Sequence, residues 1–144
     1  MGFSWNTVIA TDKGPKLANT LHGTPFIAVI GNKGYEAPFG TWVCGESSLF
    51  ELTIQHSDEK WRITSDQHLL TADNGYVPCT NLHYPGDALL QDKGNEAFGL
   101  IPVFSLSISP GFCDSSELHK IWTTYVKDIN AISSNGIVLS LVKK

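Results

Sequence analysis

The sequence predicts a single all-β domain spanning residues 1–144, and three observations support this. Apolar and β-branched residues gather in short runs rather than in long helical patterns. Glycine, asparagine, aspartate and proline interrupt these runs at short intervals, as in chains of consecutive strands. A length of 144 residues with 42% hydrophobic content supplies one compact core. We therefore expect a compact β fold with at most one or two short helices.

The expected strands are short, rich in β-branched or aromatic residues, and bounded by turn residues. Residues 103–108 alternate apolar side chains with serine, which is typical of a half-buried strand. Turn signals fall at residues 12–15, 31–34, 73–75, 85–87 and 135–136. In chain order, the expected strands cover residues 7–11, 26–30, 49–54, 61–64, 103–108, 121–126 and 136–142.

Helix signals are sparse. Residues 114–120 are the main helical candidate, because Asp114 is a suitable N-cap and Glu117 follows three residues later. Residues 16–21 are a candidate for one further turn of helix. Residues 91–99 are the most loop-like stretch of the chain.

Charge and hydrophobicity argue against several classes of partner. The formal net charge is −4, and no cluster of basic residues precedes the terminal Lys143-Lys144 pair, so we expect no nucleic acid partner. The longest clean apolar run, residues 26–30, is far short of the ~20 residues of a membrane helix. The first ten residues lack the pattern of a signal peptide. A cytoplasmic monomer without membrane contact is expected.

Cysteine and histidine spacing predicts neither a cofactor nor a metal. Cys44, Cys79 and Cys113 are odd in number and form no CxxC pattern, so we interpret them as reduced thiols. A Cys113–His119 hydrolase pair is the less favoured alternative, because nothing local brings the two residues within hydrogen-bonding reach.

A metal site is the second minority interpretation of these residue types. Hairpins bring distant segments together, so His56, His68 and His83 are candidates for a cluster. Metal binding needs three or four convergent ligands, and no HxH or HxxxH pattern supports it. We therefore expect these histidines to bind no metal.

Three stretches of the chain resemble the Hint superfamily of inteins and Hedgehog-type autoprocessing domains. In the first, Thr7 lies on an expected strand that leads to the turn GPK at residues 14–16. The second contains TSDQ at residues 64–67 and LHYPGD at residues 82–87, and is similar to the family's Thr-x-x-His block and Leu-x-x-Gly-Asp turn. The third covers residues 130–141 and ends in NGIVLSL at residues 135–141, where the family closes with Asn-Gly-Ile, two apolar residues, His and Asn.

This resemblance implies a horseshoe-like Hint fold whose two ends meet at one centre. It also implies autocatalysis, in which a first cysteine attacks the preceding carbonyl and the Thr-x-x-His block assists. In inteins a terminal asparagine then cyclises. The partners implied are the flanking host-protein segments in cis.

The positions that carry this chemistry in the family hold other residues here. Gly2 occupies the nucleophile position and has no side chain. Thr64 matches the block threonine, but Gln67 replaces its histidine, and an amide cannot protonate a leaving nitrogen at neutral pH. Ser140 stands at the position of the penultimate histidine, and Leu141 at that of the cyclising asparagine. The resemblance therefore indicates a processing-inactive form.

Three further positions bear on this interpretation. Thr123 and Asn130 align with an aspartate and a histidine of the family's penultimate block. His68 follows Gln67 directly, so on a strand it points to the opposite face unless a β-bulge turns it back.

The alternative function is a non-catalytic, β-rich module that binds a partner protein. The chain has four tryptophans, Trp5, Trp42, Trp61 and Trp122, which is many for its length. Packing in the core and between strands is the favoured explanation for them. A binding face is the other explanation, and it belongs with this alternative function.

Overall fold

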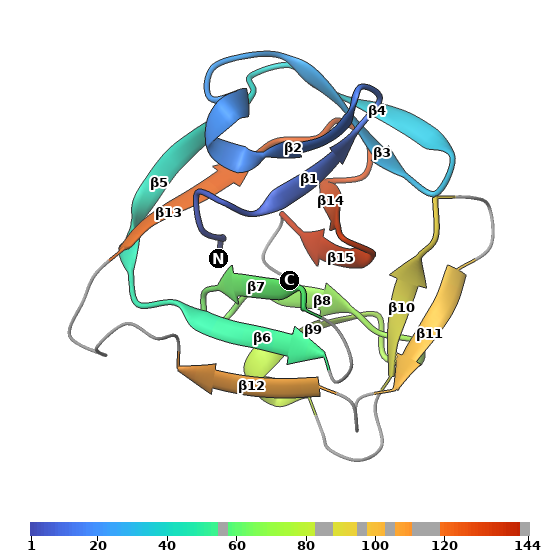
Figure 1. Cartoon of the computed structure of the whole chain (residues 1–144). Helices are drawn as coiled ribbons and strands as arrows, with labels where there is room; N and C mark the ends of the chain where they lie inside the picture. The colour runs from blue at the N-terminus through green and yellow to red at the C-terminus, as the bar shows by residue number, and fades with distance from the viewer. Residues whose placement is uncertain (55–57, 83–87, 95–97, 103–105, 111–118, 142–144) are drawn as a thin grey trace.

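The computed structural model consists almost entirely of short antiparallel strands that curl around a central hairpin (Figure 1). It describes residues 1–54, 58–82, 88–94, 98–102, 106–110 and 119–141. Within these ranges the only helical elements are two 3-10 turns, η1 (Ala18–Leu21) and η2 (Cys79–Asn81). The all-β prediction is confirmed. No helix in the described ranges is long and apolar enough to span a membrane.

The N-terminal part of the chain forms a four-stranded antiparallel sheet in the order β2-β1-β3-β4. Two-residue turns join β1 to β2 and β3 to β4, because Thr11 pairs with Gly14 and Ile30 pairs with Lys33. The strands are β1 (Val8–Thr11), β2 (Gly14–Leu17), β3 (Phe26–Ile30) and β4 (Lys33–Ala37).

A second sheet has the order β11-β10-β15-β8-β9, with β14 also paired to β15. The last described strand, β15, therefore lies in the middle of this sheet. A tight turn at Asn135 and Gly136, both with positive φ, joins β14 to β15 as the Asn-Gly signal predicts. The strands are β8 (His68–Leu70), β9 (Tyr76–Pro78), β10 (Ala88–Asp92), β11 (Phe98–Pro102), β14 (Ala131–Ser134) and β15 (Ile137–Ser140).

Two smaller sheets complete the curl. One has the order β12-β6-β7, and the other pairs β13 with β5. The strands are β5 (Thr41–Ser47), β6 (Phe50–Ile54), β7 (Lys60–Ile63), β12 (Leu106–Pro110) and β13 (His119–Thr124).

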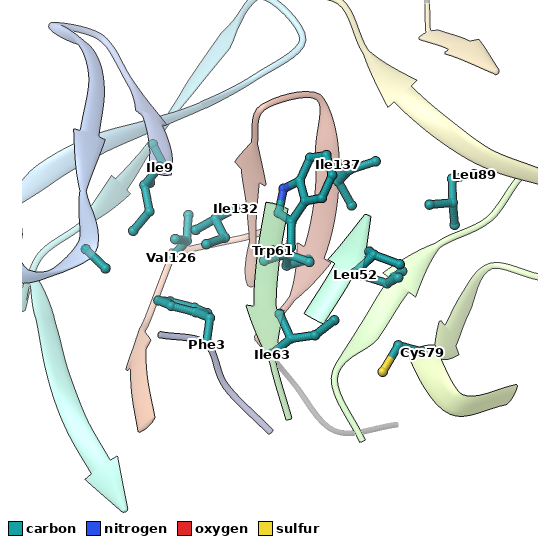
Figure 2. Packing of buried hydrophobic residues seen from close by; sticks show 14 of the residues in the cluster. Phe3, Ile9, Leu52, Trp61, Ile63, Cys79, Leu89, Val126, Ile132 and Ile137 are labelled. Carbon is teal, nitrogen blue, oxygen red and sulfur yellow. The ribbon is translucent and has the colours of Figure 1, made fainter. Parts of the chain in front are cut away.

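The core joins segments that are far apart in the sequence (Figure 2). Phe3, Ile63 and Leu139, which come from the start, middle and end of the chain, are fully buried in one cluster. The buried indole of Trp61 donates a hydrogen bond of 2.9 Å to the Ser134 carbonyl. Both ends of the described chain are thus built into the same core.

Two expectations from local sequence differ from the structure. His119 and Lys120 are not helical, because they pair with Ser47 and Glu46 of β5, and this pairing outweighs the local capping signal. The remainder of that helix prediction, at residues 114–118, lies outside the described residues.

The loop expected at residues 91–99 is also partly wrong. Gln91 and Asp92 belong to β10 and pair with Gly99 and Phe98 of β11. The candidate helical turn at residues 16–21 is confirmed only at Ala18–Leu21, since Lys16 and Leu17 belong to β2.

Candidate functional site

The first residues of the chain lie between two strands that are distant in sequence. Phe3 forms bridges to Ile63 at the end of β7 and to Trp122 in β13. The Phe3 amide donates to the Trp122 carbonyl at 3.1 Å, and the Trp122 amide donates to the Phe3 carbonyl at 2.8 Å. The Phe3 side chain is fully buried. These contacts fix the position of the preceding residue, Gly2.

Thr64 holds the backbone of Gly2 through a reciprocal pair of hydrogen bonds. The Gly2 amide donates to Thr64 Oγ1 at 3.1 Å. The Thr64 amide donates to the Gly2 carbonyl at 3.0 Å. The Thr64 hydroxyl therefore touches the peptide group that joins Met1 to Gly2, which is the peptide next to the predicted nucleophile position.

Gly2 has no room for a side chain. A Cβ atom built on Gly2 would overlap the Cγ2 methyl of Ile121 and would lie 2.8 Å from the Trp122 carbonyl oxygen. Both neighbours belong to β13, and the carbonyl cannot move away by a change of rotamer. Only glycine fits this arrangement of the backbone.

Gln67 connects the Thr64 segment to the end of β15. Its Nε2 donates to the Ser140 carbonyl at 2.7 Å and to the His68 carbonyl at 3.0 Å. Two carbonyl acceptors fix which end of the amide carries the nitrogen. The side chain is only 1% exposed, and its Oε1 has no hydrogen-bond partner among the described residues.

The predicted positions form one hydrogen-bonded series. Gly2 bonds to Thr64, the Gln67 amide donates to the Thr64 carbonyl at 3.1 Å, and Gln67 bonds to Ser140. Leu141 follows directly, and its amide donates to the Asn130 carbonyl at 2.8 Å. The structure thus brings the two ends of the chain together, although the sequence does not show these contacts.

Asp66 adds a charge beside Thr64. Thr64 Oγ1 donates to Asp66 Oδ1 at 2.8 Å, and the Met1 ammonium lies 3.3 Å from the same oxygen. Burial by itself raises the pKa of Asp66, but the Thr64 hydrogen bond and the Met1 charge outweigh it, so the pKa lies below its usual value. Asp66 is therefore an acceptor here and not a proton donor at neutral pH.

Cys79 lies behind the same segment. Its thiol is 3.3 Å from the Ser65 carbonyl oxygen and 3.5 Å from the Thr64 carbonyl oxygen. Burial, with a contribution from the Asp66 charge, raises the pKa of Cys79 to about 11. The group remains a thiol at neutral pH and acts as a hydrogen-bond donor to the backbone rather than as a nucleophile.

The side chains of His68 and Thr123 flank this series without joining it. His68 Nδ1 is 2.8 Å from the Asp66 carbonyl oxygen, and His68 pairs with Pro78 without a register shift. Thr123 Oγ1 lies 3.5 Å from the Thr124 carbonyl oxygen.

Nothing in the described ranges adds a metal site. His56, His83 and Cys113, which the sequence offered as ligands or as a nucleophile, lie outside these ranges, and His119 is part of β13. No group of three or more metal-ligating side chains occurs within the described ranges.

Gly2 and Gln67 lack two chemical groups that catalysed amide cleavage requires. Covalent catalysis needs an activated nucleophile, and Gly2 has none. Protonation of a leaving nitrogen needs a group that titrates near neutral pH, and Gln67 has none. Sequence reasoning missed Asp66 and Cys79 as partners of this segment, although both lie within or close to the matched stretch.

Comparison with known proteins gives a consistent result for the fold. No protein-family model matches the sequence, and no curated protein matches it. Among solved structures, a variant of the Ssp DnaB mini-intein superposes with a TM-score of 0.79 at 13% identity, covering 96% of this chain and 93% of that one.

Two further structures agree. The DnaX mini-intein from Spirulina platensis has a TM-score of 0.71 at 13% identity, covering 97% of this chain and 99% of that one. A bacterial intein-like domain from Clostridium thermocellum has a TM-score of 0.68 at 20% identity, covering 96% of each chain. The intein-type Hint fold is thereby confirmed, while similarity at this level of identity says nothing about activity.

Proposed function

We propose that this chain is an intein-like, self-processing Hint domain in a processing-inactive form, flanked by host-protein segments in cis. The observation that carries this proposal is Gly2. It occupies the nucleophile position of the resemblance, and the overlap with Ile121 and the nearby Trp122 carbonyl exclude even a methyl group there. The site is therefore closed to a nucleophile and not merely missing one.

The peptide bond between Met1 and Gly2 has only part of the surroundings that the resemblance implies. Thr64 Oγ1 accepts the hydrogen of the Gly2 amide, which supports planar amide geometry but supplies no proton to the nitrogen. Gln67 is at the position of the block histidine, and its Nε2 already donates hydrogen bonds to two carbonyl acceptors. Cleavage would require a proton donor that neither residue provides.

The downstream end is inert for a different reason. Asparagine cyclisation needs a side-chain amide at the last position, and Leu141 has only hydrocarbon. The Leu141 amide is held by the Asn130 carbonyl at 2.8 Å. Ser140, at the position of the penultimate histidine, is buried and has no group that titrates near neutral pH. The proposal therefore covers both junctions.

Fusion between two reporter proteins tests the proposal. With reporters joined at Met1 and Lys144, we expect a single polypeptide by intact mass after several days, with or without added thiol. An active mini-intein between the same reporters is the positive control. Thiol-dependent release of the upstream reporter, abolished by Thr64→Ala, would show that the site is active and that the proposal is wrong.

A further inference from the structure

A second site lies next to the N-terminal segment. It is a hollow of about 330 Å³ whose lining includes Trp5, Trp122, Arg62, His119 and Lys120, together with Ser4, Asn19 and Leu49. We call it the Trp5 hollow. Its lining side chains take no part in the hydrogen-bonded series from Gly2 to Ser140, so the proposed loss of processing does not explain it.

Trp5 presents an indole to solvent from a fixed backbone. Its side chain is 51% exposed, whereas Trp61 is 2% exposed and packs in the core. The Ser4 amide donates to the Arg62 carbonyl at 2.9 Å, and the Asn19 amide donates to the Trp5 carbonyl at 3.0 Å. A large aromatic side chain on an anchored backbone loses little conformational entropy on binding, so it is well suited to hold a ligand.

Trp122, the second tryptophan of the hollow, is also held in place by its neighbours. The Trp122 ring packs edge-on against His22, with 5.5 Å between ring centroids and an interplanar angle of 86°. Trp122 additionally pairs with Phe3 through two backbone hydrogen bonds. The two tryptophans thus form an aromatic lining that exists before any ligand binds.

The charged side chains of the hollow favour an anion. Arg62 and Lys120 line it, and no acidic residue does so among the described residues, although the chain has 14 acidic and 10 basic residues. Glu51 lies between two cations, 3.9 Å from Arg62 Nε and 3.8 Å from Lys60 Nζ. Glu46 is opposite Lys120 in the ladder, but neither Glu51 nor Glu46 lines the hollow, so Arg62 and Lys120 are the charged side chains that line it among the described residues.

We propose that the Trp5 hollow binds an acidic peptide segment of a partner protein. An aromatic or aliphatic side chain of the segment packs on the Trp5 indole, and a neighbouring carboxylate lies between Arg62 and Lys120. Arginine and lysine form charge-assisted hydrogen bonds with carboxylates. A nucleic acid fits less well, since its affinity depends on many neutralised phosphates and this chain carries a net charge of −4.

A titration followed by nuclear magnetic resonance tests the proposal on the intact chain. The probe is a blocked pentapeptide, Ser-Glu-Phe-Asp-Ser, and the matched control is Ser-Lys-Phe-Lys-Ser. We expect the acidic peptide to shift the indole N–H signals of Trp5 and Trp122 and to leave that of Trp61 in place. Binding should weaken as salt is added, because the ion pairs are screened.

Variants assign the effect to the hollow. Trp5→Ala and Lys120→Glu should each weaken binding about fivefold or more, as expected for residues at the centre of a contact. Lys33→Glu changes an exposed lysine of β4 that does not line the hollow, and it should leave the affinity unchanged. Spectra of the free variants report whether each remains folded.

Several outcomes would overturn the proposal. Absence of any shift at millimolar peptide would do so, as would equal binding of the lysine peptide. If Lys33→Glu weakened peptide binding as much as Lys120→Glu, the effect would come from the net charge of the protein and not from the hollow. A short oligothymidylate that binds more tightly than the acidic peptide would assign the hollow to nucleic acid instead.

Discussion

The substitution Gly2→Ala tests the most consequential contact in the site. It adds one methyl group at a position where the added Cβ overlaps Ile121 and lies 2.8 Å from the Trp122 carbonyl oxygen. Real Cβ atoms essentially never approach another atom so closely. Gly2 cannot retreat easily, because it shares two hydrogen bonds with Thr64 and precedes the anchored Phe3.

Two opposing effects set the magnitude of the loss. Overpacking a well-packed interior costs about 1–3 kcal/mol. Replacing glycine by alanine restricts the unfolded chain, which returns about 0.4–1 kcal/mol where the native conformation allows it. The overpacking effect is the larger, so we expect a net loss of about 1–2 kcal/mol. For a chain of this size that lowers Tm by roughly 3–6 °C.

Urea denaturation and thermal melting measure this loss, and the chain provides a matched control. Gly45→Ala adds the same methyl group in β5, where it meets no atom within 4 Å, so it should be neutral or slightly stabilising. Ile121→Ala removes one of the two overlapping atoms. The double variant should therefore lose less stability than the sum of the single variants, by about 0.5 kcal/mol or more.

Equal stability of Gly2→Ala and Gly45→Ala would refute the reasoning. It would mean that the N-terminal segment moves freely enough to accept a side chain. The first junction would then be open to a nucleophile, and the proposed processing-inactive form would rest on sequence alone.

Three further predictions concern Gln67 and the cysteines Cys44 and Cys79. Gln67→Met should cost about 2 kcal/mol in urea denaturation, because it removes the buried side-chain donor to the Ser140 and His68 carbonyls. Iodoacetamide should label the exposed Cys44 in the native protein and Cys79 only after unfolding, as peptide mass mapping would show. Because burial raises the pKa of Cys79 from 9.0 to about 11, the protein should lose stability as pH rises through that interval.

Local sequence predicted the strands that are rich in β-branched and aromatic side chains. Residues 26–30 match β3 at both ends, and the Asn135-Gly136 turn lies where its signal placed it. The missed strands depend on partners elsewhere in the chain. In β2, Gly14 and Pro15 indicated a turn, yet they pair with Thr11 and Ala10 at the edge of a sheet, where proline is tolerated.

The candidate site, like the strands, was predicted only in part from the sequence. The resemblance implied that Gly2, Thr64, Gln67 and Ser140 lie together, and the structure brings them into one hydrogen-bonded series. Their equivalence to the family's catalytic residues stays a prediction. The crowding at Gly2 had no sequence signal. It is produced by Ile121 and Trp122, more than a hundred residues away, and only the pairing of Phe3 with β13 brings them there.

The position of β15 has a consequence for synthesis on the ribosome. This strand is the last one described, and it lies between β10 and β8 in the middle of its sheet. Until residues 137–140 emerge, the edges of both neighbouring strands lack their partner, and the buried face around Leu139 has no cover. Topologies rich in such distant pairings fold slowly, in about milliseconds to seconds. The earlier strands of this sheet are therefore fully paired only after residues 137–140 have been made.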